Sequence, residues 1–435
     1  MDEKTKDAPL LVGAAEVEIT PPVGTPMAGG LSPRISAGVE DPLYVKSIVL
    51  ESAGRRLAYV VFDLVSLGRK EGDRGVALSS ELTGIPAENI VWTATHTHTG
   101  PYVRESVDGQ PALNRDWLER VPGMMAECVA AADRAKMPGR FCRLRSFQYN
   151  LGHNRRVSFK DGHAINTWNL ARSREDVQSV GSSGPVDPEI GILSFDDARG
   201  NLLAVLFHFT LHAETNFGPR FSGDYPAVVA ARIRERFGPG VVTLFAPGAC
   251  GDINTSLFPY PSHRRIGDAL AVKIISALEA RSPENNPLHL SSSKREVPVP
   301  RRDFGEGQEK RIADSGWPEE LQKYFLLSLE ALRKEGKKED LTVLQAWRIG
   351  EVGFASLPGE LFVEWGLKIK RESPFDWTYP VELGGDSLGY LVTEKAWNEG
   401  GYEPLGKTSY QGVAMMVENA LQMLRRLKEE NVKLK

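Results

Sequence analysis

The sequence predicts a protein of the α/β class, because strand-like and helix-like segments alternate along the chain. Residues 57–62 are apolar at every position, which is typical of a central strand buried on both faces. Residues 408–429 carry apolar side chains at helical spacing, which predicts an amphipathic helix near the end of the chain. The order of the strands in the sheet does not follow from these patterns.

The remaining elements follow from the same two periodicities and from turn residues. Strands are expected over residues 10–19, 44–51, 57–65, 90–94, 141–149, 189–195, 202–211 and 241–245, with a β-hairpin over 341–349 and 352–357. Helices are expected over residues 117–135, 224–237, 264–280, 320–334, 360–371 and 408–429. The helix at 224–237 has the clearest ends, with Asp224 as N-cap, Pro226 in the first turn and Gly238 after the last turn.

Size and composition are those of an ordinary folded protein, with 435 residues, 41% hydrophobic and 25% charged. A chain of this length buries enough apolar surface to fold without a structural metal, so a bound metal would serve chemistry. The formal net charge is −4 and the basic residues are scattered among acids, which argues against a nucleic-acid partner. No apolar stretch approaches the roughly 18 residues of a membrane span.

Cysteine usage and the N-terminus predict a cytoplasmic protein. Three cysteines, Cys128, Cys142 and Cys250, are an odd number without CxxC spacing, which fits a reducing compartment. Residues 1–10 lack the basic-then-apolar layout of a secretory signal, so secretion would require a signal removed from the chain. Cys250 lies in a Gly-rich turn, where a small packing residue is the expected role and a thiol nucleophile the alternative.

The strongest local motif is the run at residues 95–101, which contains His96 and His98. Two histidines at i and i+2 on an extended segment face the same side, and an imidazole pair suits a zinc site. Gly100 and Pro101 place the pair at a strand end, where α/β proteins bind ligands. The alternative is a pair of solvent-exposed histidines in a loop.

A second histidine pair, His208 and His212, follows the apolar run at 202–207. Residues at i and i+4 share a face on both a strand and a helix, so the spacing alone does not assign a role. His208 lies inside the apolar run and is expected to be a core histidine. His212 follows the run beside polar residues, and we therefore prefer it as a metal ligand.

Several further polar residues have two possible roles. Glu360 follows a Pro-Gly turn, where it is either a ligand or an acid at a helix start that interacts with the helix dipole. Tyr390 and Tyr402 follow glycines and, on this evidence, would pass as ordinary aromatics. Arg155 is either a group that orients a carbonyl near the metal or part of a solvated basic turn.

Taken in order, these segments resemble the catalytic domain of the neutral, non-lysosomal ceramidase family. The segments that carry the resemblance are residues 12–22, 27–29, 41–43, 63, 95–101, 154–155, 206–215, 222–225, 251–252, 358–360, 390–393 and 402–403. The resemblance covers nearly the whole chain, and so many segments in one order are specific. It implies a layered α/β fold with a mixed β-sheet core flanked by helices.

The resemblance also implies the roles of individual residues. It implies a zinc ion held by His96, His212, Glu360 and Tyr390. It further implies that His98, Arg155 and Tyr402 contact the substrate or the developing oxyanion. We accordingly expect residues 1–435 to form a single ceramidase-like catalytic domain, without the C-terminal immunoglobulin-like domain of that family.

One position departs from the family pattern. Ceramidases carry a serine with a key catalytic hydroxyl after Gly-Asp-Val, whereas here Asn254 follows Gly251, Asp252 and Ile253. An amide cannot be acylated in that role, although Asn254 can donate a hydrogen bond to a substrate.

The sequence therefore predicts a zinc-dependent hydrolase that cleaves an N-acyl amide bond of a small, lipid-like molecule with a metal-activated water. The first alternative is a zinc hydrolase of a small soluble ester, lactone or sugar derivative, which the missing serine favours. The second is a non-catalytic binding protein that keeps the fold. The substrate, the physiological metal and the oligomeric state do not follow from the sequence.

Overall fold

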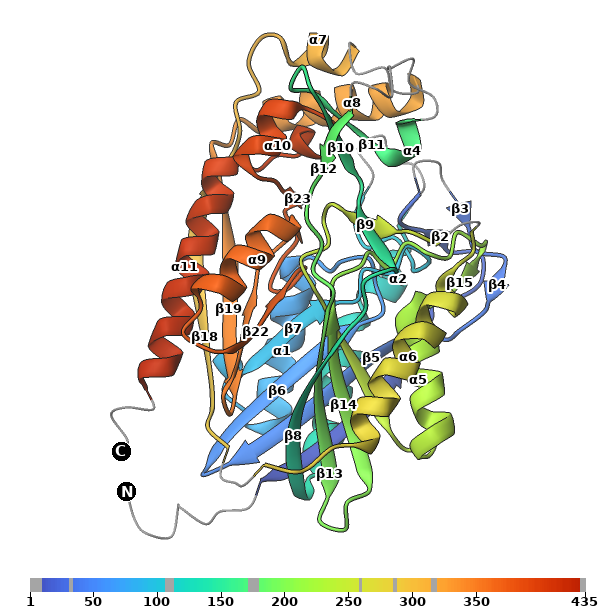
Figure 1. Ribbon diagram of the computed structural model, residues 1–435, viewed down its shortest axis with the longest axis vertical. Coiled ribbons are helices and arrows are strands. Elements are labelled where there is room, and N and C mark those ends of the chain that lie inside the picture. The colour runs from blue at the N-terminus through green and yellow to red at the C-terminus, as the bar shows by residue number, and fades with distance from the viewer. Residues whose placement is uncertain are drawn as a thin grey trace.

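The computed structural model describes residues 10–30, 34–105, 113–170, 180–257, 260–284, 288–313 and 319–430. It has the predicted α/β architecture, with two large β-sheets, several small ones and flanking helices (Figure 1). Residues 1–10, which we searched for a secretory signal, lie outside the described residues except for Leu10. No helix in the described ranges is long and apolar enough to cross a membrane.

The larger sheet has eight strands in the order β16-β14-β13-β8-β1-β5-β6-β7. It is mixed, because β6 pairs with β7 and β14 with β16 in parallel while the other neighbours are antiparallel. Its strands are β1 (Leu11–Glu18), β5 (Tyr44–Ser52), β6 (Arg55–Phe62), β7 (Ile90–Ala94), β8 (Met137–Phe147), β13 (Glu189–Asp197), β14 (Leu202–Phe209) and β16 (Val242–Pro247).

The smaller sheet has four strands in the order β18-β19-β20-β22 and contains the predicted hairpin. These strands are β18 (Leu290–Pro300), β19 (Glu339–Ile349), β20 (Val352–Ser356) and β22 (Trp377–Val381). The two sheets share one buried core, in which the ring of Tyr59 on β6 stacks on that of Trp347 on β19, with ring centroids 5.6 Å apart. Alternate side chains of β6 therefore face the smaller sheet and the helices, which explains why its sequence is apolar at every position.

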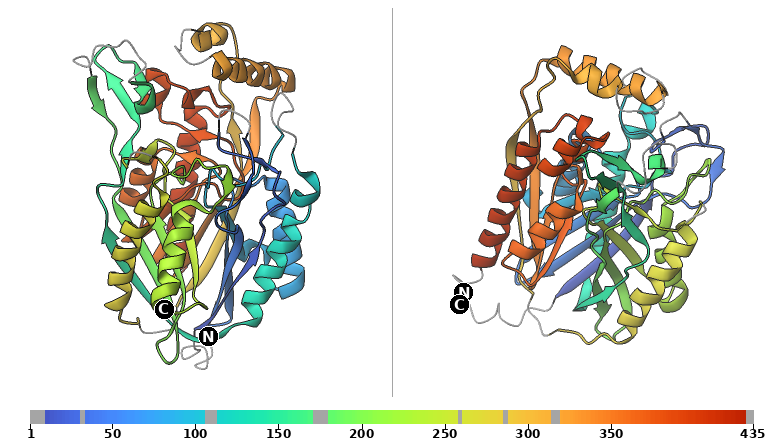
Figure 2. Two further views of the ribbon diagram at one scale, coloured as in Figure 1. Left: turned by 90° about the vertical axis from the view of Figure 1, so that its right-hand side faces the viewer. Right: turned by 45° about the horizontal axis from the view of Figure 1, so that its top comes forward.

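Helices cover the outer faces of both sheets (Figure 1, Figure 2). The outer helices of the larger sheet are α1 (Arg69–Thr83), α3 (Val121–Arg134), α5 (Asp224–Phe237) and α6 (His263–Glu279). The smaller sheet is covered by α9 (Val363–Glu372) and α11 (Tyr410–Glu429). Two further helices, α7 (Gln308–Ala313) and α8 (Glu319–Glu335), lie at one end of the molecule (Figure 1).

Strong curvature of the larger sheet brings its two halves together. Strand β16, at one end of the strand order, contacts β5, β6 and β7 near the other end. The Tyr59 hydroxyl of β6 donates to the Phe245 carbonyl of β16 at 3.1 Å. As a result, the loops that follow β7 and β14 meet at one place, although five strands separate β14 from β7 in the sheet order.

Short strands and helices complete the chain. The short strands are β2 (Pro26–Met27), β3 (Arg34–Ile35), β4 (Gly38–Val39), β9 (Gly152–Asn154), β10 (Arg156–Phe159), β11 (Ala164–Asn166), β12 (Val180–Ser183), β15 (Arg220–Phe221), β17 (Ile253–Thr255), β21 (Glu360–Leu361) and β23 (Tyr390–Leu391). The short helices are η2 (Ala87–Asn89), α2 (Arg115–Leu118), α4 (Thr167–Leu170), α10 (Glu394–Glu399) and η4 (Glu403–Leu405).

Three predicted details are wrong. The helix expected over 117–135 is divided into α2 and α3, with Pro122 in the first turn of α3, where a missing N–H costs nothing. The helix expected from residue 360 begins at Val363, and Glu360 lies in β21. The N-cap of α5 is Gly223, and Asp224 follows it at a φ of 57°.

Candidate metal centre

Three histidines from distant parts of the sequence meet where the curved sheet closes. His96 and His98 lie in the turn after β7, and His212 lies in the turn after β14. Their metal-binding nitrogens lie within 4.8 Å of one another, and all three side chains are buried. The structure thus brings together both histidines of the first motif and the preferred histidine of the second.

The turn at residues 95–101 differs from the extended segment that we expected. His96 has a φ of 66°, a left-handed conformation that is uncommon for residues other than glycine. This conformation places the rings of His96 and His98 edge to face, with centroids 4.7 Å apart. Gly29 is required beside them, because a Cβ on it would lie 2.5 Å from the Cβ of His98. The surrounding structure therefore fixes a strained backbone at the candidate site.

Each imidazole donates its Nδ1 proton to a backbone carbonyl. The acceptors are Val65 for His96 at 2.7 Å, Gly29 for His98 at 2.9 Å, and Cys250 for His212 at 2.5 Å. Because a carbonyl only accepts, Nδ1 carries the proton and, in a neutral ring, Nε2 keeps its lone pair. Such a hydrogen bond from the second nitrogen is characteristic of histidines that bind metals.

Glu360 completes the cluster from β21. One of its carboxylate oxygens, Oε2, lies 3.5 Å from Nε2 of His96 and 3.5 Å from Nε2 of His212. The Nε2 atoms of His96 and His98 are 3.2 Å apart. Two ligands of one tetrahedral zinc at 2.0–2.1 Å lie about 3.3 Å from each other, so these separations fit a shared ion.

Two of these atoms are buried without a hydrogen bond to any residue that the structure describes. They are Nε2 of His212 and Oε2 of Glu360. An unpaired buried polar atom is costly, and a metal ion would satisfy both atoms at once. Imidazole and carboxylate are also the ligands that zinc prefers in catalytic sites, so the residues fit the ion that the sequence predicts.

The charges within the cluster are strongly coupled. Burial raises the pKa of Glu360, but the neighbouring His96 and His212 outweigh it and hold this pKa well below its usual range. Burial lowers the pKa of His96, and the charge of Glu360 overcomes it to raise this pKa to about 9. Burial, followed by His96 and His212, lowers the pKa of His98 well below its usual value. His98 is therefore a neutral acceptor at neutral pH.

Tyr390 reaches the same region because β23 pairs with β21 in parallel, with Tyr390 opposite Glu360. Its hydroxyl lies 3.0 Å from the hydroxyl of Tyr402. Burial and then the charge of Glu360 raise the pKa of Tyr390 well above its usual value. These observations place Tyr390 beside the cluster, and its role as a metal ligand stays a prediction.

Arg155 links the other residues that we expected around the substrate. This fully buried guanidinium donates to Asn254 Oδ1 at 3.1 Å, to the Tyr402 hydroxyl at 2.5 Å and to Glu403 Oε1 at 3.1 Å. The Trp168 ring covers it, with the ring centroid 5.2 Å from Cζ of Arg155. Arg155 is thus held inside the protein, and its visible contacts position Tyr402 and Asn254.

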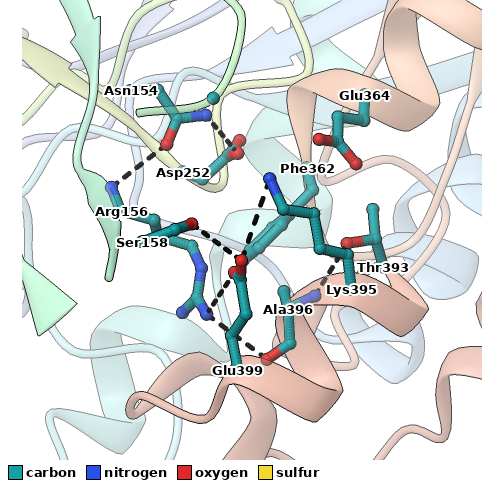
Figure 3. Close-up of a pocket in the computed structure, with 11 residues that line it drawn as sticks. Asn154, Arg156, Ser158, Asp252, Phe362, Glu364, Thr393, Lys395, Ala396 and Glu399 are labelled. Carbon is teal, nitrogen blue, oxygen red and sulfur yellow. Dashed lines mark hydrogen bonds and ion pairs between the residues drawn. The ribbon is translucent and has the colours of Figure 1, made fainter. Parts of the chain in front are cut away.

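A small polar pocket lies beside these residues, and none of the three histidines lines it (Figure 3). Along its wall Asn154 donates to Asp252 at 2.6 Å, and Asp252 accepts a second bond from the Val363 amide at 2.8 Å. Asn154 and Asp252 directly precede Arg155 and the strand that carries Asn254. The residues around this pocket therefore support the site from outside.

His208 and Cys250 both have packing roles. His208 donates from Nε2 to the Pro380 carbonyl at 2.8 Å and packs on Tyr379 in the core, as expected. The Cys250 thiol donates to Glu382 at 3.0 Å, and burial raises its pKa well above the usual value. The carbonyl of Cys250, rather than its thiol, serves the cluster through His212.

Three acids near the centre were missed in the sequence. Glu214 lies two residues after His212, and this proximity was a usable signal. Glu382 and Glu403 are recognised only by their contacts, with the Cys250 amide and with Arg155 respectively. Burial raises the pKa of Glu214 and of Glu382 to about 7.

The fold and the cluster together define an α/β protein with a buried site of three histidines and a glutamate that fits a metal ion. No protein-family model matches the chain. The chain is 25% identical over 272 residues to neutral ceramidase of Pseudomonas aeruginosa, an alignment that covers 59% of this chain. It spans 38% of the length of that relative.

Solved structures show the same fold over almost the whole chain. A crystal structure of neutral ceramidase from Pseudomonas aeruginosa superposes with a TM-score of 0.75 at 20% identity, covering 98% of this chain and 75% of that one. A ceramidase complexed with C2 gives a TM-score of 0.74 at 19% identity, covering 98% and 76%. The predicted resemblance to the neutral ceramidase family and the predicted layered fold are therefore confirmed.

Proposed function

We propose that this chain is a zinc-dependent hydrolase that cleaves an N-acyl amide bond, as a neutral ceramidase would. The observation that carries the proposal is the convergence of three imidazole Nε2 atoms and the Glu360 carboxylate in a buried site. The similarity to a neutral ceramidase supports the amide-hydrolase class. We assign the metal to His96, His212, Glu360 and Tyr390.

A zinc ion bound there would supply a Lewis acid that polarises the scissile carbonyl and lowers the pKa of water. The chain itself supplies the groups around the reacting carbonyl. His98 is neutral and offers Nε2, 3.2 Å from Nε2 of His96, as an acceptor for a proton from the attacking group. The Tyr402 hydroxyl, polarised by Arg155, is the donor for the negative charge that develops on the carbonyl oxygen.

Asn254 favours a second candidate function. Its side-chain oxygen accepts from Arg155, so it occupies a place in the site without offering a nucleophilic hydroxyl. A small soluble ester, lactone or sugar derivative, cleaved at the same metal, is therefore the alternative substrate class. The cytoplasmic location predicted from the sequence stays a prediction.

The test is release of fatty acid from a short-chain ceramide in mild detergent by zinc-loaded protein. His212→Ala is the inactive variant, and His163→Ala, which changes a partly exposed histidine outside the cluster, is the matched control. We expect wild type and His163→Ala to bind zinc and release fatty acid, and His212→Ala to lose both. Zinc binding without release would move the search to soluble esters and sugar derivatives, and full zinc content and activity in His212→Ala would refute the proposal.

A further inference from the structure

We propose that Glu214 is a specificity residue that accepts a hydrogen bond from a hydroxyl or ammonium group of the substrate. The inference rests on the proposed function and names the substrate chemistry of the same site. Glu214 lies beside the cluster, with its Oε1 3.7 Å from Nδ1 of His98. The side chain is 21% exposed, so a ligand can reach it.

The backbone on both sides of Glu214 is fixed. The Ala213 carbonyl accepts from the His98 amide at 3.0 Å. The amides of Thr215 and Asn216 both donate to one oxygen of Asp224 at 2.9 Å. Asp224 is itself buried at a φ of 57°, a conformation that costs free energy and that this loop contact helps to stabilise. The loop is thus built to hold residue 214 in one place.

The Glu214 side chain that this loop holds accepts no hydrogen bond from the residues that the structure describes. Nδ1 of His98 points its proton at the Gly29 carbonyl, so its 3.7 Å approach to Glu214 is only electrostatic. Within the described parts of the chain, no group donates a hydrogen bond to the Glu214 carboxylate. Arg155, whose charge lowers the pKa of this carboxylate against burial, donates instead to Asn254, Tyr402 and Glu403.

The Glu214 carboxylate is partly open, so its hydrogen-bond donors come from water or from a bound ligand rather than from the protein. In its ionised form this carboxylate only accepts hydrogen bonds, so the complementary group on a substrate is an O–H or N–H donor. An aliphatic chain at this position would leave the carboxylate unpaired and would be rejected. We therefore infer that the part of the substrate beside His98 is a hydroxyl- or amine-bearing group, and that the acyl chain lies elsewhere.

Three small amides test the inference by binding rather than by turnover. They are N-acetylethanolamine, N-acetylethylenediamine and N-propylacetamide, which place a hydroxyl, an ammonium and a methyl group at the same position. Binding to zinc-loaded protein is measured by ligand-observed NMR titration for wild type, Glu214→Ala and Glu214→Gln. The matched control is Glu364→Gln, a partly buried acid beside the separate pocket of Figure 3.

We expect wild type and Glu364→Gln to bind the hydroxyl or the ammonium probe about tenfold or more tightly than the methyl probe, since a hydrogen bond to a charged group has that effect. Glu214→Ala should bind all three alike, and Glu214→Gln should keep only a preference for the hydroxyl. Equal binding of the three probes by wild type, or an unchanged preference in Glu214→Ala, would overturn the inference. The metal content of each protein is measured in parallel, so a failure of the zinc site is seen separately.

Discussion

Glu382 is expected to fix two segments of the candidate metal centre, at Cys250 and Leu361, relative to each other. Its carboxylate accepts from the amide of Cys250 at 3.1 Å and from the amide of Leu361 at 3.2 Å. Cys250 presents the carbonyl that orients His212, and Leu361 directly follows Glu360. Both amides donate to the same oxygen, Oε2, and the Cys250 thiol donates to Oε1. Replacing Glu382 with glutamine can keep one oxygen for the two amides, but it removes the charge that strengthens both bonds and turns an NH₂ group toward the thiol. We therefore expect both segments to be held less firmly.

The magnitude follows from that contact. A hydrogen bond to a charged group contributes about 1.5–3 kcal/mol, and changes in the partners that orient metal ligands typically weaken metal binding about 10- to 100-fold. The two estimates agree, because tenfold corresponds to about 1.4 kcal/mol. Glu382→Gln should therefore raise the zinc dissociation constant about 10- to 100-fold.

The assay is competition with a chromophoric zinc chelator at neutral pH. Asp196→Asn is the matched control, because Asp196 is a buried carboxylate paired with Arg281 at the opposite end of β14 from His212. Both variants should lower the free energy of unfolding of the metal-free protein, but only Glu382→Gln should weaken zinc binding. If both variants bound zinc as tightly as wild type, the positioning role of Glu382 would be refuted.

Two further predictions concern pH and the position of the missing serine. Burial raises the pKa of Glu382 to about 7, and the charge of Glu360 overcomes burial to raise that of His96 to about 9, against about 4.3 and 6.5 in an unfolded chain. Below about pH 6.5 the lowered pKa values of His98 and His212 act in the opposite direction, because the unfolded chain protonates these histidines more readily. From about pH 7 to 9 the folded metal-free protein holds protons that the unfolded chain has released, so its stability should fall and the zinc-induced rise in Tm should grow over that range. Scanning fluorimetry with zinc or a chelator measures this, and a zinc-induced rise in Tm that did not change from about pH 7 to 9 would contradict it. Asn254→Ala removes an acceptor of Arg155 and should lower activity about tenfold while zinc content is retained, whereas complete loss of activity would assign Asn254 an essential step.

Long apolar strands and amphipathic helices were predictable because their periodicity is local. The strand at β7 (Ile90–Ala94) and the span of α5 (Asp224–Phe237) match the expected ranges, and His212 was correctly preferred over His208 from the boundary of the apolar run. The two-residue strands β21 and β23 contain no period, yet their pairing places Tyr390 beside Glu360. That juxtaposition was accessible only through resemblance to a family.

The acids around the site were less predictable than the histidines. An HxH motif is visible in a sequence, but the role of Glu382 depends on two amides, of Cys250 and Leu361, that only the folded chain brings together. The same holds for the left-handed conformation of His96, which the surrounding structure imposes on a residue that does not favour it. Tertiary contacts rather than local pattern therefore determine the electrostatics of the centre.

The hydrogen-bond chain from Arg155 assigns different tasks to the two tyrosines. A guanidinium only donates, so the oxygen of Tyr402 accepts the bond from Arg155 and the proton of Tyr402 is directed toward another acceptor. The Tyr390 oxygen, 3.0 Å away, is one such acceptor, and this bond would hold Tyr390 with its oxygen lone pairs available next to Glu360. A substrate oxyanion would compete for the same proton. Tyr402 thus suits charge stabilisation and Tyr390 suits metal binding, and Arg155 supports both from a position without direct contact with the cluster.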